Sequence, residues 1–341
     1  MNHAAAEQIL AMLKEDSARD EAFFVLNEKT DHNEEVRNAI AYMLAREPDD
    51  SWIQQLACKP MSQARMVEAF EKSLSEDLLQ KIAPQDKPLF QSCLLGVLPL
   101  HGINGHAQCR DYFGNTLDRP LLLINYGVYF ISTYLAYALT FEILQNDLAD
   151  FKRSGADFFL LAQSFYRNKN APADLLARTS FESLPRDVTN EIGWHAGRLS
   201  SVMLWFVALH EFAHVRHGDI GASFWKSMCP AGLDYSGCNS KELLFRQEEA
   251  ADRYAVESLG AWRDKSSNAW SNFAQAYLLM KFLEVMEEQQ PASNITHPPA
   301  RRRKELMYKH AVESASHLPS DDYMAFVEYL VDKWIRETQE R

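Results

Sequence analysis

The sequence lacks an excess of positive charge, because 35 lysine and arginine residues face 47 aspartate and glutamate residues, a formal net charge of −12. Such a chain does not attract nucleic acid, and anionic membrane surfaces repel it. Cysteine is also scarce, with five residues scattered along 341. An odd, scattered set is typical of reduced thiols in a reducing compartment. We therefore expect no nucleic-acid partner and a cytoplasmic location.

We also expect no secretion signal, since residues 1–16 have neither a basic start nor a long apolar core. The stretch Leu121–Phe141 runs for 21 residues without a charge, which is long enough to span a bilayer. It also contains Asn125 and four tyrosines, and polar groups are costly in lipid. We therefore expect a buried strand at Leu121–Asn125, then a buried helix to about Leu144, and no membrane partner; a membrane span is the alternative.

Residues 1–85 have the pattern of helices separated by short acidic breaks, with a faint likeness to HEAT-type repeats. The first 86 residues carry 17 acidic and 9 basic side chains, a net charge of −8. The segment Pro84 to Pro88 is the most favourable boundary. We predict a helical domain at 1–85, whose acidic face offers a surface for a protein partner, and a second domain at 86–341. The alternative is that the first helices pack directly on the second domain.

A pair of histidines at helical spacing stands in the run HEFAH, within a helix predicted from Asn190 to Gly218. His210 and His214 lie four residues apart and so share one helix face, where both imidazoles can reach a single ion. Glu211 beside them can contact a water on that ion. The residues before the motif are almost all apolar, which predicts a buried helix. In a buried place, the two histidines and the glutamate need a partner. A metal ion is one such partner; a solvated helix end is the alternative.

A second helix offers a third ligand. Asn239–Glu242 has the pattern of a capping box and predicts a helix that stops at Gly260. Glu248 and Asp252 lie four apart in this helix and share a face. Zinc hydrolases with two histidines take a carboxylate from a second helix, and a further carboxylate orients a ligand histidine. We predict these two roles for Glu248 and Asp252; a solvated acidic face is the alternative.

Other histidines each allow two interpretations. His297 lies in the proline-stiffened run THPPARRR. His297 and a following arginine are candidates to stabilise an oxyanion, or they belong to a basic helix start. His217 returns to the face of His210 after seven residues and is either a ligand or a helix-end histidine near the helix dipole. His101 and His106 flank a Gly-rich loop, where solvated side chains are commoner than metal ligands.

The motifs HEFAH, EEAAD and THPPARRR together resemble the gluzincin metallopeptidases, especially the HtpX-like group, over roughly residues 120–308. The resemblance implies one zinc ion per chain and a set of site residues: the ligands His210, His214 and Glu248, the general base Glu211, the supporting Asp252, and His297 and Arg303 near the reaction centre. The HtpX-like group has membrane helices that this chain lacks. The Lit-like phage-exclusion peptidases fit its length better, which suggests a role in phage defence.

The resemblance also implies that an edge strand near the metal pairs with extended substrate, and Leu121–Asn125 resembles that strand. The predicted fold is α+β and mostly helical, with a small sheet over the metal helix in a zincin-like core. The predicted function is zinc-dependent hydrolysis of peptide bonds in a protein substrate, in which His297 is an oxyanion stabiliser or a fourth zinc ligand. The alternative is a zinc-containing binding or sensing protein that acts through its N-terminal helices, although an intact Glu211 argues against it.

Overall fold

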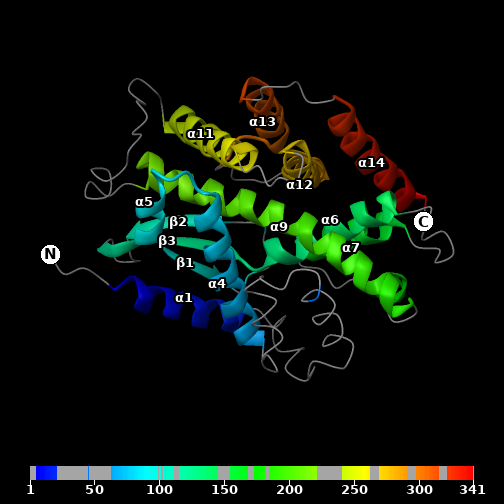
Figure 1. Cartoon of the computed structure of the whole chain (residues 1–341), viewed down its shortest axis with the longest axis horizontal. Coiled ribbons are helices and arrows are strands. Elements are labelled where there is room, and N and C mark those ends of the chain that lie inside the picture. Colours follow the sequence, from blue (N-terminus) through cyan, green and yellow to red (C-terminus); the bar gives the residue numbers. More distant parts are fainter. Residues whose placement is uncertain are drawn as a thin grey trace.

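The computed structural model describes residues 5–20, 45, 63–98, 100, 103, 105–110, 115–144, 154–167, 173–181, 184–220, 240–261, 269–289, 297–314 and 321–340. The protein is α+β and mostly helical, as the sequence predicts (Figure 1). The helices are α1 (Ala6–Asp20), α4 (Gln63–Lys81), α5 (Lys87–Ser92), α6 (Gly127–Ile143), α7 (Gly155–Tyr166), α8 (Ala173–Thr179), α9 (Arg186–His217), α11 (Ser240–Ala261), α12 (Ala269–Gln289), α13 (Ala300–Ser314) and α14 (Asp321–Gln339). The strands are β1 (Leu94–Leu98), β2 (Gly105–Arg110) and β3 (Thr116–Asn125).

The strands form one mixed sheet in the order β1-β3-β2. β1 runs parallel to β3, with Leu94 opposite Leu121, and β2 runs antiparallel to it, with Gly105 opposite Ile124. Because β3 is hydrogen-bonded on both sides, it has no free edge for another strand. The expectation that Leu121–Asn125 is a substrate-pairing edge strand is therefore wrong; the edges of the sheet are β1 and β2.

The alternation of side chains along β3 separates two apolar layers. Leu121 and Leu123 pack with Leu10 of α1, whereas Leu122 and Ile124 face the main core. Helix α1 therefore covers one face of the sheet and α9 the other (Figure 1). Helix α4 lies along the β1 edge, where the N–H of Val97 donates to Glu71 Oε2 at 2.8 Å. This contact satisfies a backbone donor of an edge strand.

The uncharged stretch Leu121–Phe141 forms the second half of β3 and most of α6, as predicted. Helix α6 packs between α7 and α9, and its rings contact aromatic side chains of neighbouring elements, including Phe70 and Phe165. Its tyrosines thus lie in a protein interior that offers aromatic neighbours. Within the described ranges, no helix combines the length and apolarity needed to cross a membrane.

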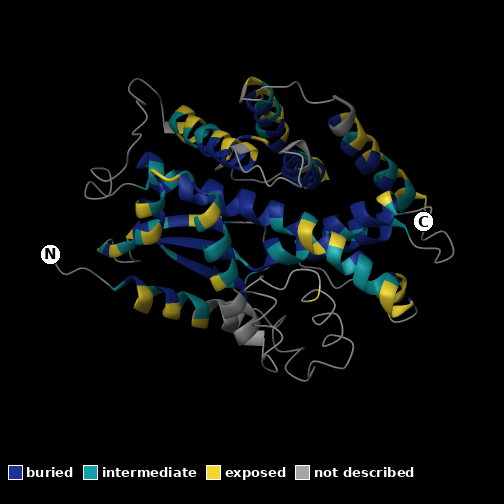
Figure 2. Ribbon diagram, in the orientation of Figure 1, coloured by how far each residue is buried: buried dark blue, intermediate teal, exposed yellow. Residues whose placement is uncertain are grey.

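Helix α9 is the centre of the molecule. It begins at Arg186, before the predicted Asn190, and ends at His217 after 32 residues. It contacts α4, α6, α11, α12, β2 and β3, and every residue from Val202 to Ala213 is buried (Figure 2). A helix that is apolar on all sides is stable only when protein surrounds it. The sequence run before HEFAH thus fixes the central place of this helix.

The predicted boundary near residue 85 lies in a packed region. Leu74, Leu78 and Ile82 of α4 belong to the same apolar core as α9, and Asp86 is fully buried. Residues 21–44 and 46–62 lie outside the described residues. The separate domain at 1–85, its HEAT-like character and its acidic partner surface therefore stay predictions.

Candidate metal centre

Two imidazoles meet near the C-terminal end of α9. The Nε2 atoms of His210 and His214 lie 3.3 Å apart. The Nδ1 of His210 donates to Asp252 Oδ1 at 2.9 Å, and the Nδ1 of His214 donates to Asp219 Oδ2 at 3.1 Å. Because a carboxylate only accepts, each Nδ1 carries a proton, so in the neutral form of either ring the Nε2 presents a lone pair. Two ring nitrogens that face one another at this distance leave a place between them for a cation, which is either a proton or a metal ion.

Helix α11 brings the third candidate ligand. The helix predicted to stop at Gly260 is confirmed, and it packs along α9. Glu248 Oε2 lies 3.4 Å from His210 Nε2, and Glu248 Oε1 lies 3.5 Å from His214 Nε2. The ligand atoms of these three residues all lie within 4.8 Å of one another. We call this group the triad; it is a set that could hold a metal ion.

Arg303, in the first turn of α13, lies behind the triad. Its Nε donates to Asp252 Oδ2 at 2.8 Å, and its Nη2 donates to Asp252 Oδ1 at 2.7 Å. A two-point contact of this kind fixes the carboxylate in orientation as well as in distance. Asp252 in turn holds the ring of His210, and Arg303 Nη2 also lies 4.0 Å from Glu248 Oε2, so Arg303 supports the triad both through Asp252 and directly.

His297 lies at the more open side of the cluster, with 46% of its side chain exposed. Its Nδ1 is 2.7 Å from Glu248 Oε2. That oxygen is buried and makes no hydrogen bond of acceptable geometry with any described residue. His297 therefore contacts the third triad residue and is not itself a member of the triad.

Asp219, the acceptor for His214, is a residue that sequence reasoning did not single out. Its position depends on Gly218, which ends α9 in the left-handed conformation at φ 75°. This cap turns the chain so that the N–H of Asp219 donates to the His214 carbonyl at 3.0 Å, while the carboxylate returns to the His214 ring. Glycine suits that conformation because it has no Cβ. The available signal was a Gly-Asp pair directly after the motif helix.

The cluster concentrates negative charge in a buried place. Its charged groups are four carboxylates and one guanidinium: Glu211, Asp219, Glu248, Asp252 and Arg303. Burial acts to lower the pKa of His210, but its contacts with two carboxylates outweigh burial and raise the pKa to about 10. Burial likewise opposes ionisation of Asp252, yet the contact with Arg303 lowers its pKa to about 2. Both shifts mean that this cluster attracts positive charge, so a divalent cation fits it.

Residues 154–320 match the family model of Peptidase U49, the Lit peptidase family. The matched segment contains every residue of the triad and also Glu211, Asp252, His297 and Arg303, whereas the sheet, α1, α4 and α6 precede it. The match indicates a peptidase and supports the Lit-like part of the resemblance. The likeness to the HtpX-like group stays a prediction. No curated protein and no solved structure matches the chain.

Glu211 borders the triad without belonging to it. Glu211 is 7% exposed, and its carboxyl group lies against Gly105 at the start of β2. A carboxylate that is close to the ligands, yet is not one of them, has the location that a general base needs. Within the Peptidase U49 match, this makes Glu211 the candidate for proton transfer.

Asp86, which precedes the Peptidase U49 match, connects the two helices that carry the triad. Its Oδ2 accepts hydrogen bonds from Arg216 Nε at 2.9 Å and from the Tyr254 hydroxyl at 3.1 Å. Arg216 follows His214 in α9 by two residues, and Tyr254 follows Asp252 in α11 by two. Breaking a buried pair of this kind costs about 3–5 kcal/mol. Asp86 therefore holds α9 and α11 in register below the triad.

No further histidine of the described ranges joins the triad. His217 is buried, packs edge-on against the ring of Tyr254 at 6.2 Å, and has its pKa lowered to about 4 by burial. His217 is thus the helix-end histidine of the two alternatives, because it is the last residue of α9, and its lowered pKa leaves the ring neutral at pH 7. His106 lies in β2 and is exposed, and His101 lies outside the described residues.

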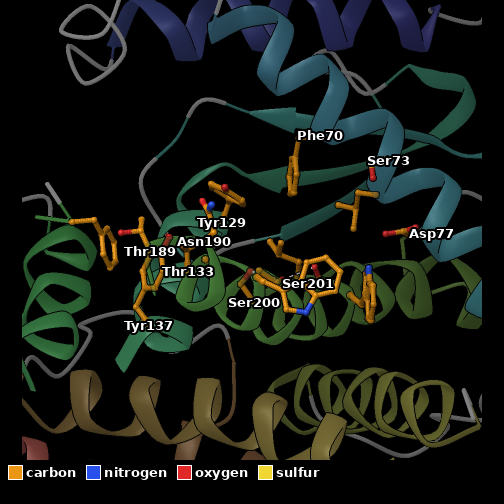
Figure 3. A pocket seen from close by; sticks show the side chains of 17 residues that line it. Phe70, Ser73, Asp77, Tyr129, Thr133, Tyr137, Thr189, Asn190, Ser200 and Ser201 are labelled. Carbon is orange, nitrogen blue, oxygen red and sulfur yellow. Dashed lines mark hydrogen bonds between the residues drawn. The ribbon is translucent and has the colours of Figure 1, made fainter. Parts of the chain in front are cut away.

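A cavity of about 300 Å³ lies farther back along the same helix (Figure 3). Its walls come from α4, α6 and mainly the N-terminal half of α9. Phe181, which lies between α8 and α9 in the sequence, also lines it. Aromatic rings and hydroxyl groups line it, among them Phe70, Tyr129, Tyr137, Trp194, Ser200 and Ser201. No triad residue lines this space, so the cavity and the metal centre are separate features of α9.

Proposed function

We propose that the protein is a zinc-dependent metalloendopeptidase that hydrolyses peptide bonds of a protein substrate and holds one zinc ion per chain. The observation that carries this proposal is the convergence of His210, His214 and Glu248 within 4.8 Å, beside the buried Glu211. All four residues lie in the segment that matches Peptidase U49. Two imidazoles and one carboxylate are the donor set of hydrolytic zinc sites that keep an open position.

Zinc held by the triad would supply Lewis acidity, which lowers the pKa of a water molecule and polarises the scissile carbonyl. Glu211 accepts a proton from the attacking water and passes it to the leaving amine. Asp252 and Asp219 accept the Nδ1 protons of the two histidines and so keep each Nε2 available as a ligand. Arg303 fixes Asp252 from the other side.

His297 is the proposed donor to the oxyanion of the tetrahedral intermediate. Its partly exposed position beside Glu248 supports this role, because a substrate would have to approach the cluster from solvent. The resemblance to Lit-like peptidases leads us to propose a cytoplasmic substrate and a role in phage defence. The acidic segment 1–85 is the proposed surface for a protein partner, and the net charge of −12 argues against nucleic acid or membranes as partners.

The metal is tested by measuring zinc content in Glu248→Gln and in Glu249→Gln. Glu249 is the matched control, because it neighbours Glu248 in α11 and pairs with Arg302 outside the triad. We expect one zinc per chain in the wild type and in Glu249→Gln, and strongly reduced zinc in Glu248→Gln. Full zinc occupancy in Glu248→Gln would remove it as third ligand.

The reaction is tested by an unbiased search for new protein N-termini in cells that produce the wild type or Glu211→Gln. The amide is nearly isosteric, so we expect Glu211→Gln to keep zinc and fold but to lose cleavage by about 10²–10⁴-fold. Cleavage at the wild-type rate would defeat the peptidase mechanism. A biological effect that survives in Glu211→Gln, without any cleaved protein in the wild type, would favour the binding or sensing alternative.

A further inference from the structure

The first residue of β2 approaches the candidate base closely. A Cβ atom built on Gly105 would lie 2.4 Å from Glu211 Cγ, 2.6 Å from its Oε1 and 2.7 Å from its Cδ. Carbon atoms that are not bonded to one another normally stay about 3.5–4.0 Å apart. The space that any side chain at position 105 would need is therefore occupied by the carboxyl arm of Glu211.

Neither partner has an easy way to move aside. Gly105 is paired with Ile124 in the antiparallel β2–β3 ladder, and β2 packs on α9. Glu211 is only 7% exposed, so its carboxyl arm is itself enclosed by protein. A side chain at position 105 would therefore displace the Glu211 carboxylate rather than the backbone of either element.

We propose that Gly105 is a positioning residue for Glu211, because the bare backbone of β2 forms the wall against which the carboxyl arm rests. The catalytic meaning of this contact rests on the proposed function, but the contact itself does not. Gly105 precedes residues 154–320. The segment before the Peptidase U49 match therefore contributes directly to the geometry of the site.

A second glycine of the sheet, which also leaves no room for a Cβ atom, provides a matched control. A Cβ on Gly96 of β1 would meet Leu10 Cδ1 at 2.2 Å, and this contact lies in the small apolar cluster under α1. Gly96→Ala therefore introduces a comparable steric conflict into a strand of the same sheet. That conflict involves Leu10 and not Glu211. The comparison of Gly105→Ala with Gly96→Ala separates an effect on Glu211 from a general effect on the sheet.

The first test is kinetic. We expect Gly105→Ala to keep one zinc per chain and a nearly unchanged KM, while kcat falls by about 10²-fold, as expected for a catalytic group displaced by about 1 Å. Gly96→Ala should keep its kcat once it is assayed below its own unfolding temperature. Wild-type kcat in Gly105→Ala would overturn the proposal, and so would a loss of zinc that accounts for the whole decrease.

The second test needs no substrate. Thermal midpoints are measured for Gly105→Ala, Glu211→Ala and the double variant, with Gly96→Ala in both backgrounds as control. We expect Gly105→Ala to lower the midpoint when Glu211 is present and to have little effect when its side chain is truncated, whereas Gly96→Ala should lower it equally in both. Additive effects for Gly105→Ala would overturn the contact. If Glu211→Gln proves fully active, the proposed function fails while this coupling remains.

Discussion

The two halves of α9 belong to one helix and one apolar core, yet they differ in what they enclose. The N-terminal half lines a cavity with aromatic rings and hydroxyl groups, and Gly193 and Gly197 leave open space there (Figure 3). The C-terminal half carries buried titratable side chains instead, among them Glu211 and the pair His210 and His214, whose Nε2 atoms lie 3.3 Å apart. The comparison teaches that empty volume does not locate the chemistry of this protein; a buried concentration of paired charges does.

The difference has an energetic origin. Buried charged groups are tolerated only when partners compensate for lost hydration, and the C-terminal half meets this demand through contacts such as Arg303 with Asp252. The cavity makes no such demand, because its one charged lining residue is Asp77 of α4. Substitutions near the metal centre should therefore change activity, metal affinity or the pH dependence of stability, whereas substitutions at the cavity should change stability alone.

The largest effect is expected for His297→Ala. Loss of a preorganised donor to an oxyanion lowers turnover by about 10²–10³-fold, with KM and zinc content nearly unchanged. His195→Ala is the control, since His195 is an exposed histidine on the cavity half of α9, and it should keep full activity. If His297→Ala instead loosens zinc or raises activity, His297 acts as a ligand or through Glu248, which lies 2.7 Å away.

The next effect concerns stability against pH. Burial lowers the pKa of His217 to about 4, below its usual 6.5, so between these values the unfolded chain binds a proton that the folded chain does not. Stability is therefore present above pH 6.5 and is lost as the pH falls toward 4, by at most about 3 kcal/mol. Urea unfolding of metal-free protein should show this loss in the wild type and not in His217→Asn. Parallel pH profiles would show that His217 titrates alike in both states.

A smaller effect is expected for Asp252→Asn. The amide can still accept from His210, but it lacks the charge that binds Arg303 and raises ligand basicity. Such substitutions behind a metal ligand lower metal affinity by about 10–100-fold. Zinc competition with a chromophoric chelator measures it, and Asp219→Asn should show a loss of the same order. An unchanged affinity in both variants would mean that the supporting carboxylates are dispensable.

The smallest effect is expected in the cavity half. Nothing lies within 4 Å of a Cβ built on Gly197, and alanine is favoured over glycine inside a helix by about 0.5–1 kcal/mol. Gly197→Ala should therefore raise the free energy of unfolding by about this amount while zinc content and turnover stay unchanged. A drop in turnover would break the contrast between the two halves, because the cavity would then take part in the reaction.

Several features followed from local sequence. The spacing of His210 and His214, and that of Glu248 and Asp252, placed each pair on one helix face, and the structure brings the two faces together. The uncharged stretch Leu121–Phe141, with its Asn125 and four tyrosines, indicated a buried strand followed by a buried helix, which the structure contains. These features depend on the helical and strand repeats, which a single segment encodes by itself.

Other features depended on the tertiary structure. The sheet order made β3 central, although its apolar sequence is equally compatible with an edge, because strand pairing joins residues distant in the chain. The same holds for Asp86 below the two helices, for the two-point contact of Arg303 with Asp252, and for Gly105 against Glu211. The sequence by itself determined which residues share a face. Only the packing of β2, α9, α11 and α13 decided which faces meet, because contacts between distant segments follow no short repeat.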